Sequence, residues 1–475
     1  MSDIDFAATP PHIAVVGMGV MGSALALNMA DHGFAVAVTD LSADAVEKAV
    51  AQADGLSGTL VGAHSLEELV AAMAPPRSII LLIPAGDAVD AVSRQLRPML
   101  DKGDLIVDAG NANFRHTVER ARKAHAEDAL FMGIGISGGA EGARTGPSIM
   151  VGGDERAWTM LRPVLEAISA KHGDEPCAAR LGPNGAGHFI KTVHNGIEYA
   201  DMEMIAEIYG LMRDGMGMDE PDAGAIFARW NEGPLESYLI EITAKIAASS
   251  DPKTGEPTLD VIVDSAGQKG TGRWTAIEAL HLGVPVTAID AAVAARNISA
   301  RREERRRGED LFGSAPQTLG DEAPGTDVME KALLAGKIAA YAQGFTMIQA
   351  ASAEYEWDVP LGDVARIWRA GCIIRSAMLD DMADALTKEP GTNLMFLDPF
   401  AGRLRDTHDC LRQVVAVATR HGHPVPALSA ALAYFDLMRT ARGTANMIQA
   451  QRDFFGAHSF RRIDEEGAFH GPWHA

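Results

Sequence analysis

Short, β-rich apolar runs alternate with helical stretches from His12 to about Cys177. Runs of four to eight apolar residues bounded by turn residues are typical of strands buried on both faces. Strands that alternate with helices predict a doubly wound parallel sheet. We expect these strands at Ile13–Gly17, Phe34–Asp40, Ser78–Pro84, Leu105–Gly110 and Phe131–Ile136.

The pattern changes near Gly185, where the strand-like runs stop. Long stretches rich in Ala, Ile, Met and Glu follow, among them Gly187–Met212 and Ala332–Glu356, and their apolar residues recur at helical spacing. From about Arg442 the sequence becomes polar. The pattern therefore predicts an α/β region, then a large all-α region, then a C-terminal tail.

A glycine-rich turn directly follows the first predicted strand and opens a helix at Ser23–His32. In such a turn the first glycine permits the tight bend, the second lets the backbone approach a pyrophosphate, and the third lets helix and strand pack closely. The phosphates then meet the N-terminus of the helix. The α/β region is therefore expected to be a Rossmann-type coenzyme domain. The residues of the turn are Gly17, Met18, Gly19, Val20, Met21 and Gly22.

An acidic residue, Asp40, ends the second predicted strand, 18 residues after Gly22. A carboxylate at this place can bind a ribose 2′-hydroxyl and would repel a 2′-phosphate. The four residues that follow Asp40 include no basic side chain. Charge therefore favours NAD over NADP as the cofactor.

The composition excludes several classes of protein. The 475 residues are 47% apolar and 22% charged, as in a soluble globular chain. With 42 basic and 64 acidic side chains the net charge is −22, which disfavours nucleic acid and anionic membranes as partners. The N-terminus does not resemble a secretory signal, no apolar stretch suggests a membrane span, and no spacing suggests a metal site. We expect a cytoplasmic protein.

One predicted helix carries several polar groups on a single face. Lys191, His194, Asn195 and Glu198 are spaced at i, i+3, i+4 and i+7, within an arc of roughly 100°, and Tyr199 lies at its edge. A buried lysine near a carboxylate can titrate near neutrality and act as a base. The spacing alone also fits an exposed, charged helix face.

Two further glycine-rich runs and the tail carry candidate binding groups. Ser137–Arg144 follows a predicted strand, and its backbone N–H groups can hold an anion, although a surface turn is the alternative. Ser265–Gly272 lacks the Walker spacing, but its Lys269 suits a substrate phosphate. In the tail, Arg452 and His458 flank two phenylalanines, and a tail this polar needs a partner surface to become ordered.

Together these segments resemble the 6-phosphogluconate dehydrogenase family, the decarboxylating enzymes of the pentose phosphate pathway. The resemblance runs from end to end of the chain in the expected order. It rests on GMGVMG (17–22), DAGN (108–111), ISGGAEGARTGPSIM (136–150), GPNGAGHFIKTVHNGIEYADME (182–203), DSAGQKGTGRWTA (264–276) and ANMIQAQRDFFGAH (445–458).

The resemblance implies an architecture and a partner. A Rossmann coenzyme domain (1–184) would precede an all-helical substrate and dimerisation domain (185–441). The tail (442–475) would insert into the neighbouring subunit. The protein would then be a homodimer with each active site built from two chains, and a tetramer made of two such dimers is the alternative.

The resemblance also implies the reaction and the roles of residues. Lys191 would take the C3-hydroxyl proton of 6-phosphogluconate, C1 would leave as CO2, and Glu198 would protonate C1 of the resulting enediol to give ribulose 5-phosphate. The sugar acid would be held by Asn111, Ser137, Gly138, Gly139, His194 and Asn195. The phosphate would be held by Tyr199, Lys269 and Arg296, joined by Arg452 of a second subunit, whose His458 would also touch the substrate.

Two departures from the family pattern bear on the cofactor. NADP-dependent members carry Asn-Arg-Thr where this chain has Asp40-Leu41-Ser42, and many members carry a lysine where it has Pro84. Both changes remove polar or basic contacts, which agrees with NAD and leaves NADP as the alternative. The cofactor contacts expected are the glycine turn, Asp40, Leu41, Ser42, Ile83, Pro84, Ala85 and Asn111.

Two other functions are compatible with parts of this pattern. One is another β-hydroxyacid dehydrogenase acting on an unphosphorylated acid, which would leave Lys269, Arg296, Arg452 and His458 without a purpose. The other is a non-catalytic dinucleotide-binding sensor or scaffold, against which the intact pair Lys191 and Glu198 argues.

Overall fold

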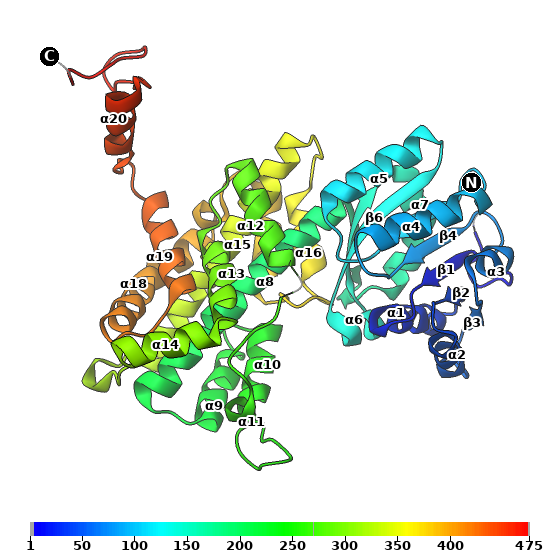
Figure 1. The fold of residues 1–475 in the computed structure, drawn as a ribbon, viewed down its shortest axis with the longest axis horizontal. Coiled ribbons are helices and arrows are strands. Elements are labelled where there is room, and N and C mark those ends of the chain that lie inside the picture. Colours follow the sequence, from blue (N-terminus) through cyan, green and yellow to red (C-terminus); the bar gives the residue numbers. More distant parts are fainter. Residues whose placement is uncertain (1–3, 269, 474–475) are drawn as a thin grey trace.

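The computed structural model describes residues 4–268 and 270–473. An α/β part at the N-terminal end is joined to a larger helical part, from which the C-terminal segment projects (Figure 1). The expected fold class, a Rossmann-type α/β domain followed by a large helical domain, is confirmed. Among the described residues, no helix is both long and apolar enough to cross a membrane.

A sheet of eight strands lies at the centre of the α/β part, in the order β10-β7-β6-β5-β4-β1-β2-β3, within the described residues. All five expected strands are present, and β3, β7 and β10 are additional. The strands are β1 Ile13–Val16, β2 Ala35–Thr39, β3 Thr59–Gly62, β4 Ser78–Leu81, β5 Leu105–Asp108, β6 Leu130–Ser137, β7 Ser148–Gly153 and β10 Ala178–Gly182, with a small ribbon of β8 Lys171–His172 and β9 Glu175–Pro176 beside them.

The expectation of a wholly parallel sheet is wrong at one place, because β7 runs antiparallel to β6. Only residues 138–147 separate these two strands. A parallel return needs a crossover of about a dozen residues or more, so this connection is too short for it. The sheet is therefore mixed, and the loop after β6 is held close to its strand.

Helices cover both faces of the sheet, as the side chains of β1 show. Ile13 and Val15 belong to one apolar cluster, whereas Ala14 and Val16 belong to another on the opposite face. Strands covered on both sides read as continuous apolar runs, which is why their pattern was visible in the sequence. The helices of this part are α1 Val20–Asp31, α2 Ala43–Gln52, α3 Leu66–Ala71, α4 Asp87–Leu96, α5 Phe114–Ala126, α6 Gly139–Thr145 and α7 Glu155–Ile168, with a 3₁₀ turn η1 Arg97–Met99.

Two long helices, α8 Ala186–Gly210 and α15 Thr326–Glu354, form the centre of the helical part. They pack closely because α15 has a glycine at the contact: a Cβ on Gly344 would lie 2.5 Å from Ile197 Cδ1. The remaining helical elements are η2 Leu211–Gly215, α9 Glu220–Trp230, α10 Tyr238–Ala247, α11 Thr258–Val261, α12 Thr271–Leu282, α13 Thr287–Ser299, α14 Arg302–Phe312, η3 Gly320–Glu322, α16 Leu361–Trp368, α17 Met378–Lys388, η4 Leu394–Phe396, α18 Phe400–Arg420, α19 Pro426–Met438 and α20 Ala445–Gly456.

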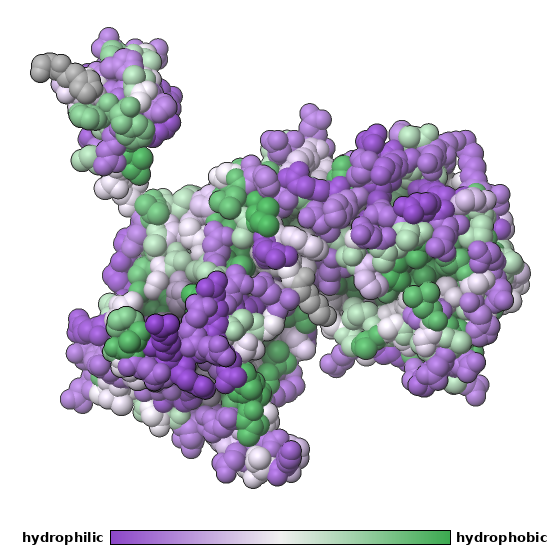
Figure 2. Space-filling model, viewed as in Figure 1, coloured by the Kyte–Doolittle hydropathy of each residue, from purple (hydrophilic) through white to green (hydrophobic). Residues whose placement is uncertain are grey.

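The tail forms a separate lobe beyond α19 (Figures 1 and 2). Its helix α20 is held by Asp453, whose carboxylate accepts hydrogen bonds from the backbone N–H of Ser459 and from Trp473 Nε1 at 2.8 and 2.7 Å. Met447 and Phe455 on this lobe are 62% and 73% exposed. Exposed apolar side chains on a projecting segment are typical of a surface that packs on another chain. Insertion into a second subunit stays a prediction.

A buried ion pair joins the two long helices. Lys337 Nζ of α15 lies 2.9 Å from Asp201 Oδ2 of α8, and the side chains are 0% and 2% exposed. The same amine donates to Ser237 Oγ at 3.2 Å. Removing only the cation would leave a buried carboxylate uncompensated, which costs about 3–5 kcal/mol.

We therefore expect Lys337→Met to lower the free energy of unfolding in urea by about 3–5 kcal/mol. Lys331→Met, on an exposed turn of the same helix, is the matched control and should change it by less than about 0.5 kcal/mol. The double variant Asp201→Asn, Lys337→Met should recover part of the loss, because no buried charge is then left alone. Equal effects of the Lys337 and Lys331 variants would contradict the pairing argument.

Candidate active site

The loops that follow β1, β4, β5 and β6 lie at one edge of the sheet. These strands are parallel neighbours, so their carboxyl ends meet there, where open α/β sheets bind ligands. Adjacent loops touch: a Cβ on Gly17 would lie 2.5 Å from the carbonyl oxygen of Leu82, and one on Gly110 would lie 3.3 Å from that of Ile83. The edge therefore forms a continuous rim from the glycine turn to Ser137.

The glycine turn has the shape that a dinucleotide pyrophosphate requires. Gly17 adopts a φ of 100°, and a Cβ on Gly22 would lie 1.8 Å from the carbonyl oxygen of Gly17, so neither position admits a side chain. A Cβ on Gly19 would meet open space, and no side chain caps the helix N-terminus that begins there. This open end of α1 fits an anionic group held by backbone N–H groups.

Asp40 lies beside this turn at the end of β2. Its carboxylate accepts hydrogen bonds from the backbone N–H groups of Met18 at 2.6 Å and Ser42 at 2.9 Å. A carboxylate has about four acceptor positions, so it retains capacity for a ribose hydroxyl. The expected cofactor residues elsewhere on the rim are accessible: Val20, Leu41, Pro84, Ala85 and Asn111 are exposed and Ile83 is half-buried.

Lys191 lies in α8 where this helix crosses β6. A Cβ on Gly135 of β6 would lie 2.4 Å from the Cβ of Lys191, so a strand residue without a side chain lets the lysine enter. Lys191 is 7% exposed, and its Nζ lies 3.4 Å from His194 Nδ1. The alternative of an exposed, charged helix face is therefore wrong for this residue.

His194 connects α8 with the loop after β6. It is fully buried, with Nε2 3.1 Å from Ser137 Oγ and Nδ1 3.1 Å from Asn195 Oδ1. Its Nδ1 also lies 3.8 Å from Glu198 Oε2, one helical turn along. The structure thus brings Lys191, His194, Asn195, Glu198 and Ser137 into one cluster.

A second cluster lies farther along α8. The guanidinium of Arg296, from α13, stacks over the ring of Tyr199 with its Cζ 3.7 Å from the ring centroid. Gly272 of α12 packs against the same ring, since a Cβ there would lie 2.5 Å from Tyr199 Cε2. Lys269, expected beside them, lies outside the described residues. An arginine held in this way presents its N–H groups in a fixed direction, which suits a phosphate.

Comparison with known proteins identifies the family. The model for the NAD binding domain of 6-phosphogluconate dehydrogenase matches residues 12–182, and that for the 6-phosphogluconate dehydrogenase C-terminal domain matches residues 187–473. The chain belongs to the 6-phosphogluconate dehydrogenase family. The resemblance drawn from the sequence motifs is thereby confirmed.

Individual members of the family are similar over nearly the whole chain. The NADP(+)-dependent, decarboxylating enzyme of Bacillus subtilis is 46% identical over 97% of this chain and 98% of its own. The NAD(+)-dependent, decarboxylating enzyme of the same organism is 43% identical over 97% and 99%. The 6-phosphogluconate dehydrogenase structure of Plasmodium falciparum, solved alone, with its cofactor NADP+ and with its substrate 6-phosphogluconate, is 38% identical. It superimposes with a TM-score of 0.92 over 97% of this chain and 100% of its own.

Burial shifts the pKa values of three groups in this cluster. It lowers the pKa of the Lys191 amine, and the charge of Glu198 opposes the shift. It raises the pKa of the Glu198 carboxyl, against the charges of Lys191 and Arg296. It lowers the pKa of His194 well below its usual value, helped by Lys191. The pKa values of all three groups are thus shifted toward the neutral forms, and the base and the acid lie on one helix about two turns apart.

Gly138 and Gly139 directly follow Ser137 of this cluster, Gly138 as the N-cap of α6 and Gly139 as its first residue. A Cβ on Gly138 would lie 2.6 Å from the carbonyl oxygen of Gly371, whereas one on Gly139 would meet open space. Arg452 and His458 lie on the projecting tail, and the structure does not bring them to Lys191 of the same chain (Figure 1).

The role of Gly135 was not predicted from the sequence. The signal was present, because glycines alternate with isoleucines in the strand GIGI, and a glycine inside a strand marks a close approach of another group.

Within the described residues, no group of three or more His, Cys, Asp or Glu is placed to hold a metal ion.

Proposed function

We propose that the protein catalyses the oxidative decarboxylation of 6-phosphogluconate to ribulose 5-phosphate and CO2, with NAD as its preferred acceptor. The observation that carries this proposal is the buried Lys191, grouped with Ser137, His194, Asn195 and Glu198 at the sheet edge that also bears the glycine turn. The relatives from Bacillus subtilis, both decarboxylating 6-phosphogluconate dehydrogenases, support the same reaction. It belongs to the pentose phosphate pathway.

The protein's own residues perform the proton transfers. A bound nicotinamide supplies the acceptor for the hydride from C3. The neutral amine of Lys191 takes the C3-hydroxyl proton, and the resulting β-keto acid can lose C1 as CO2 because its carbonyl accepts the electron pair. The protonated amine then hydrogen-bonds to the developing enolate oxygen and gives it the proton, which yields the enediol. Glu198, whose pKa burial raises, delivers a proton to C1 of the enediol while Lys191 takes back the proton of the enol hydroxyl.

The remaining candidate residues hold the substrate in this proposal. Asn111, Ser137, Gly138, Gly139, His194 and Asn195 would bind the carboxylate and hydroxyls of the sugar acid. Tyr199, Arg296 and Lys269 would bind the phosphate, together with Arg452 and His458 of a second copy of the chain. The domains would be residues 1–184, 185–441 and 442–475, and the protein would be a homodimer with shared active sites.

The preference for NAD rests on the charge of Asp40. Two backbone N–H groups fix its carboxylate beside the glycine turn, where the adenosine ribose would lie. A 2′-phosphate there would meet a fixed negative charge, and the adjacent Leu41 and Ser42 offer it no cation. Of the two relatives from Bacillus subtilis, one is NADP(+)-dependent and the other is NAD(+)-dependent, so they favour neither cofactor for this chain.

Exchange of these residues should therefore change the cofactor. In Asp40→Asn with Leu41→Arg, the repulsion is removed and a cation is added, so we expect kcat/KM for NADP relative to NAD to rise by at least about 100-fold. The Asn side chain can still accept the bond from Met18. Leu41→Gln, which adds length without charge, is the matched control. An unchanged ratio would show that other contacts set the preference.

Direct assay tests the reaction itself. Purified protein with 6-phosphogluconate should reduce NAD, and NADP more slowly, with one CO2 and one ribulose 5-phosphate per reduced nicotinamide. Gluconate, which lacks the phosphate, should be a far poorer substrate. Reduction with unphosphorylated β-hydroxyacids alone would favour the wider dehydrogenase class. No reduction with any of these acids would favour a sensor or scaffold.

A further inference from the structure

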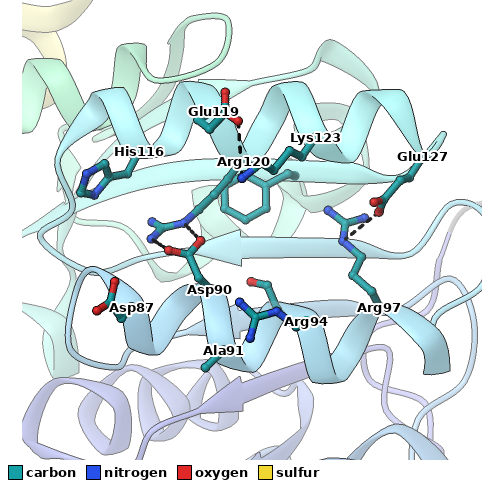
Figure 3. A pocket seen from close by; sticks show the side chains of 12 residues that line it. Asp87, Asp90, Ala91, Arg94, Arg97, His116, Glu119, Arg120, Lys123 and Glu127 are labelled. Carbon is teal, nitrogen blue, oxygen red and sulfur yellow. Dashed lines mark hydrogen bonds and ion pairs between the residues drawn. The ribbon is translucent and has the colours of Figure 1, made fainter.

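Arg120 of α5 is a buried cation for which neither the family motifs nor the reaction provides a role. It is 6% exposed, and it lies at the wall of a cavity of about 780 Å³ between α4 and α5 (Figure 3). Its guanidinium donates to both carboxylate oxygens of Asp90 on α4, at 2.8 and 3.0 Å. It also donates to Asp108 Oδ2 at 3.0 Å and to the carbonyl oxygen of Gly86 at 2.9 Å.

Two of these partners, Gly86 and Asp108, adjoin the rim loops that follow β4 and β5. Gly86 ends the loop that follows β4 and precedes the first residue of α4. Asp108 ends β5 and is fully buried, and its Oδ1 accepts the backbone N–H of Gly110 at 3.2 Å. One guanidinium therefore fixes the loop Leu82–Gly86 directly, and the Gly110–Asn111 turn through Asp108.

The two loops lie where the nicotinamide half of a dinucleotide would be bound. The pyrophosphate would lie at the glycine turn after β1, and the adenosine ribose at Asp40 after β2. The other half of the molecule must then extend across β4 and β5 toward β6, whose neighbour Lys191 performs the proposed chemistry. Ile83 and Asn111, two of the expected cofactor contacts, lie on these two loops.

We infer that Arg120 is a positioning residue that sets the spacing of these loops and so the place of the nicotinamide ring relative to Lys191. This inference rests on the proposed function. A buried ion-pair network is weak evidence for stability, because desolvation offsets most of the attraction. The planar fork of arginine binds Asp90 through two parallel hydrogen bonds and also reaches Asp108 and Gly86, a spread that the compact ammonium of a lysine does not provide.

The test compares Arg120→Lys with Arg97→Met. Arg97 lines the same cavity but pairs with Glu127, the residue that caps the C-terminal end of α5, at 3.9 Å. Calorimetry measures the affinity for NAD and for ADP-ribose, which carries the adenosine and pyrophosphate but no nicotinamide. In Arg120→Lys we expect NAD to bind about tenfold more weakly, and ADP-ribose to bind within twofold of wild type. In Arg97→Met neither affinity should change.

Kinetics supply the second readout. With 6-phosphogluconate as substrate, Arg120→Lys should lower kcat/KM for NAD by about 10- to 100-fold, while KM for 6-phosphogluconate stays within twofold. Equal weakening of NAD and ADP-ribose binding would overturn the inference, because a general loss of structure affects both halves of the dinucleotide site alike. A lower melting temperature with unchanged NAD affinity and kcat would also overturn it, because Arg120 would then contribute to stability alone. If the wild-type protein does not turn over 6-phosphogluconate, the proposed function fails. The two affinities then decide the role of Arg120 by themselves.

Discussion

Lys191→Met should abolish reduction of the cofactor and leave dinucleotide binding intact. The substitution removes the group that takes the C3-hydroxyl proton, which contributes about 10²- to 10⁴-fold. It also removes the hydrogen bond to the developing enolate, which is worth about a further 10²- to 10³-fold. We therefore expect turnover to fall by at least about 10⁴-fold in a stopped or continuous assay with 6-phosphogluconate and NAD.

The same variant should remain folded and bind NAD normally. Methionine fits the space of the lysine stem, and Gly135 still admits its Cβ. Burial already lowers the pKa of Lys191, so loss of the amine removes a group that is costly to charge in this place. Lys245→Met, on an exposed face of α10, controls for the loss of a lysine. Turnover within tenfold of wild type would remove Lys191 from the mechanism.

The sequence alone could predict those strands that are buried on both faces. It did not reveal β3, because this strand lies at the sheet edge and its residues 59 and 62 are exposed, which breaks the apolar run. Nor did it reveal the reversed direction of β7. The length of the connection between two strands limits their relative direction. Because β7 was not recognised as a strand, the length of its connection to β6 could not be used.

The candidate site was predictable where its residues share one helix. Lys191, His194 and Glu198 follow from helical spacing, and the structure groups them as that spacing requires. Contacts between distant segments were not predictable in this way. The burial of Lys191 depends on Gly135 in a strand 56 residues earlier, and the stacking on Tyr199 comes from Arg296 on another helix.

The role inferred for Arg120 shows the limit most clearly. The sequence places this arginine within a charged helix, where a solvated side chain is the ordinary expectation. Its burial follows from Asp90 and Asp108, which come from a neighbouring helix and from the end of β5. No spacing rule connects these three positions, so only the folded arrangement of α4, α5 and β5 reveals them.

Glu198→Gln should slow the reaction by about 10²- to 10⁴-fold, because the amide cannot deliver a proton to C1 of the enediol. The fold should be retained, since the side chain keeps its size and its place on α8. Release of CO2 should be slowed less than formation of ribulose 5-phosphate, so the enediol or its products should accumulate in a single turnover followed by carbon-13 NMR. Unchanged turnover would assign the proton delivery to another acid.

The same substitution should shift the pH dependence in a definite direction. The carboxylate of Glu198 raises the pKa of Lys191, opposing the effect of burial. Its removal should therefore lower the pKa of Lys191 further, so the amine becomes neutral, and able to act as a base, at lower pH. The acidic limb of the profile of kcat/KM against pH should move to lower pH in Glu198→Gln. A shift to higher pH would show that Glu198 does not act on the lysine through its charge.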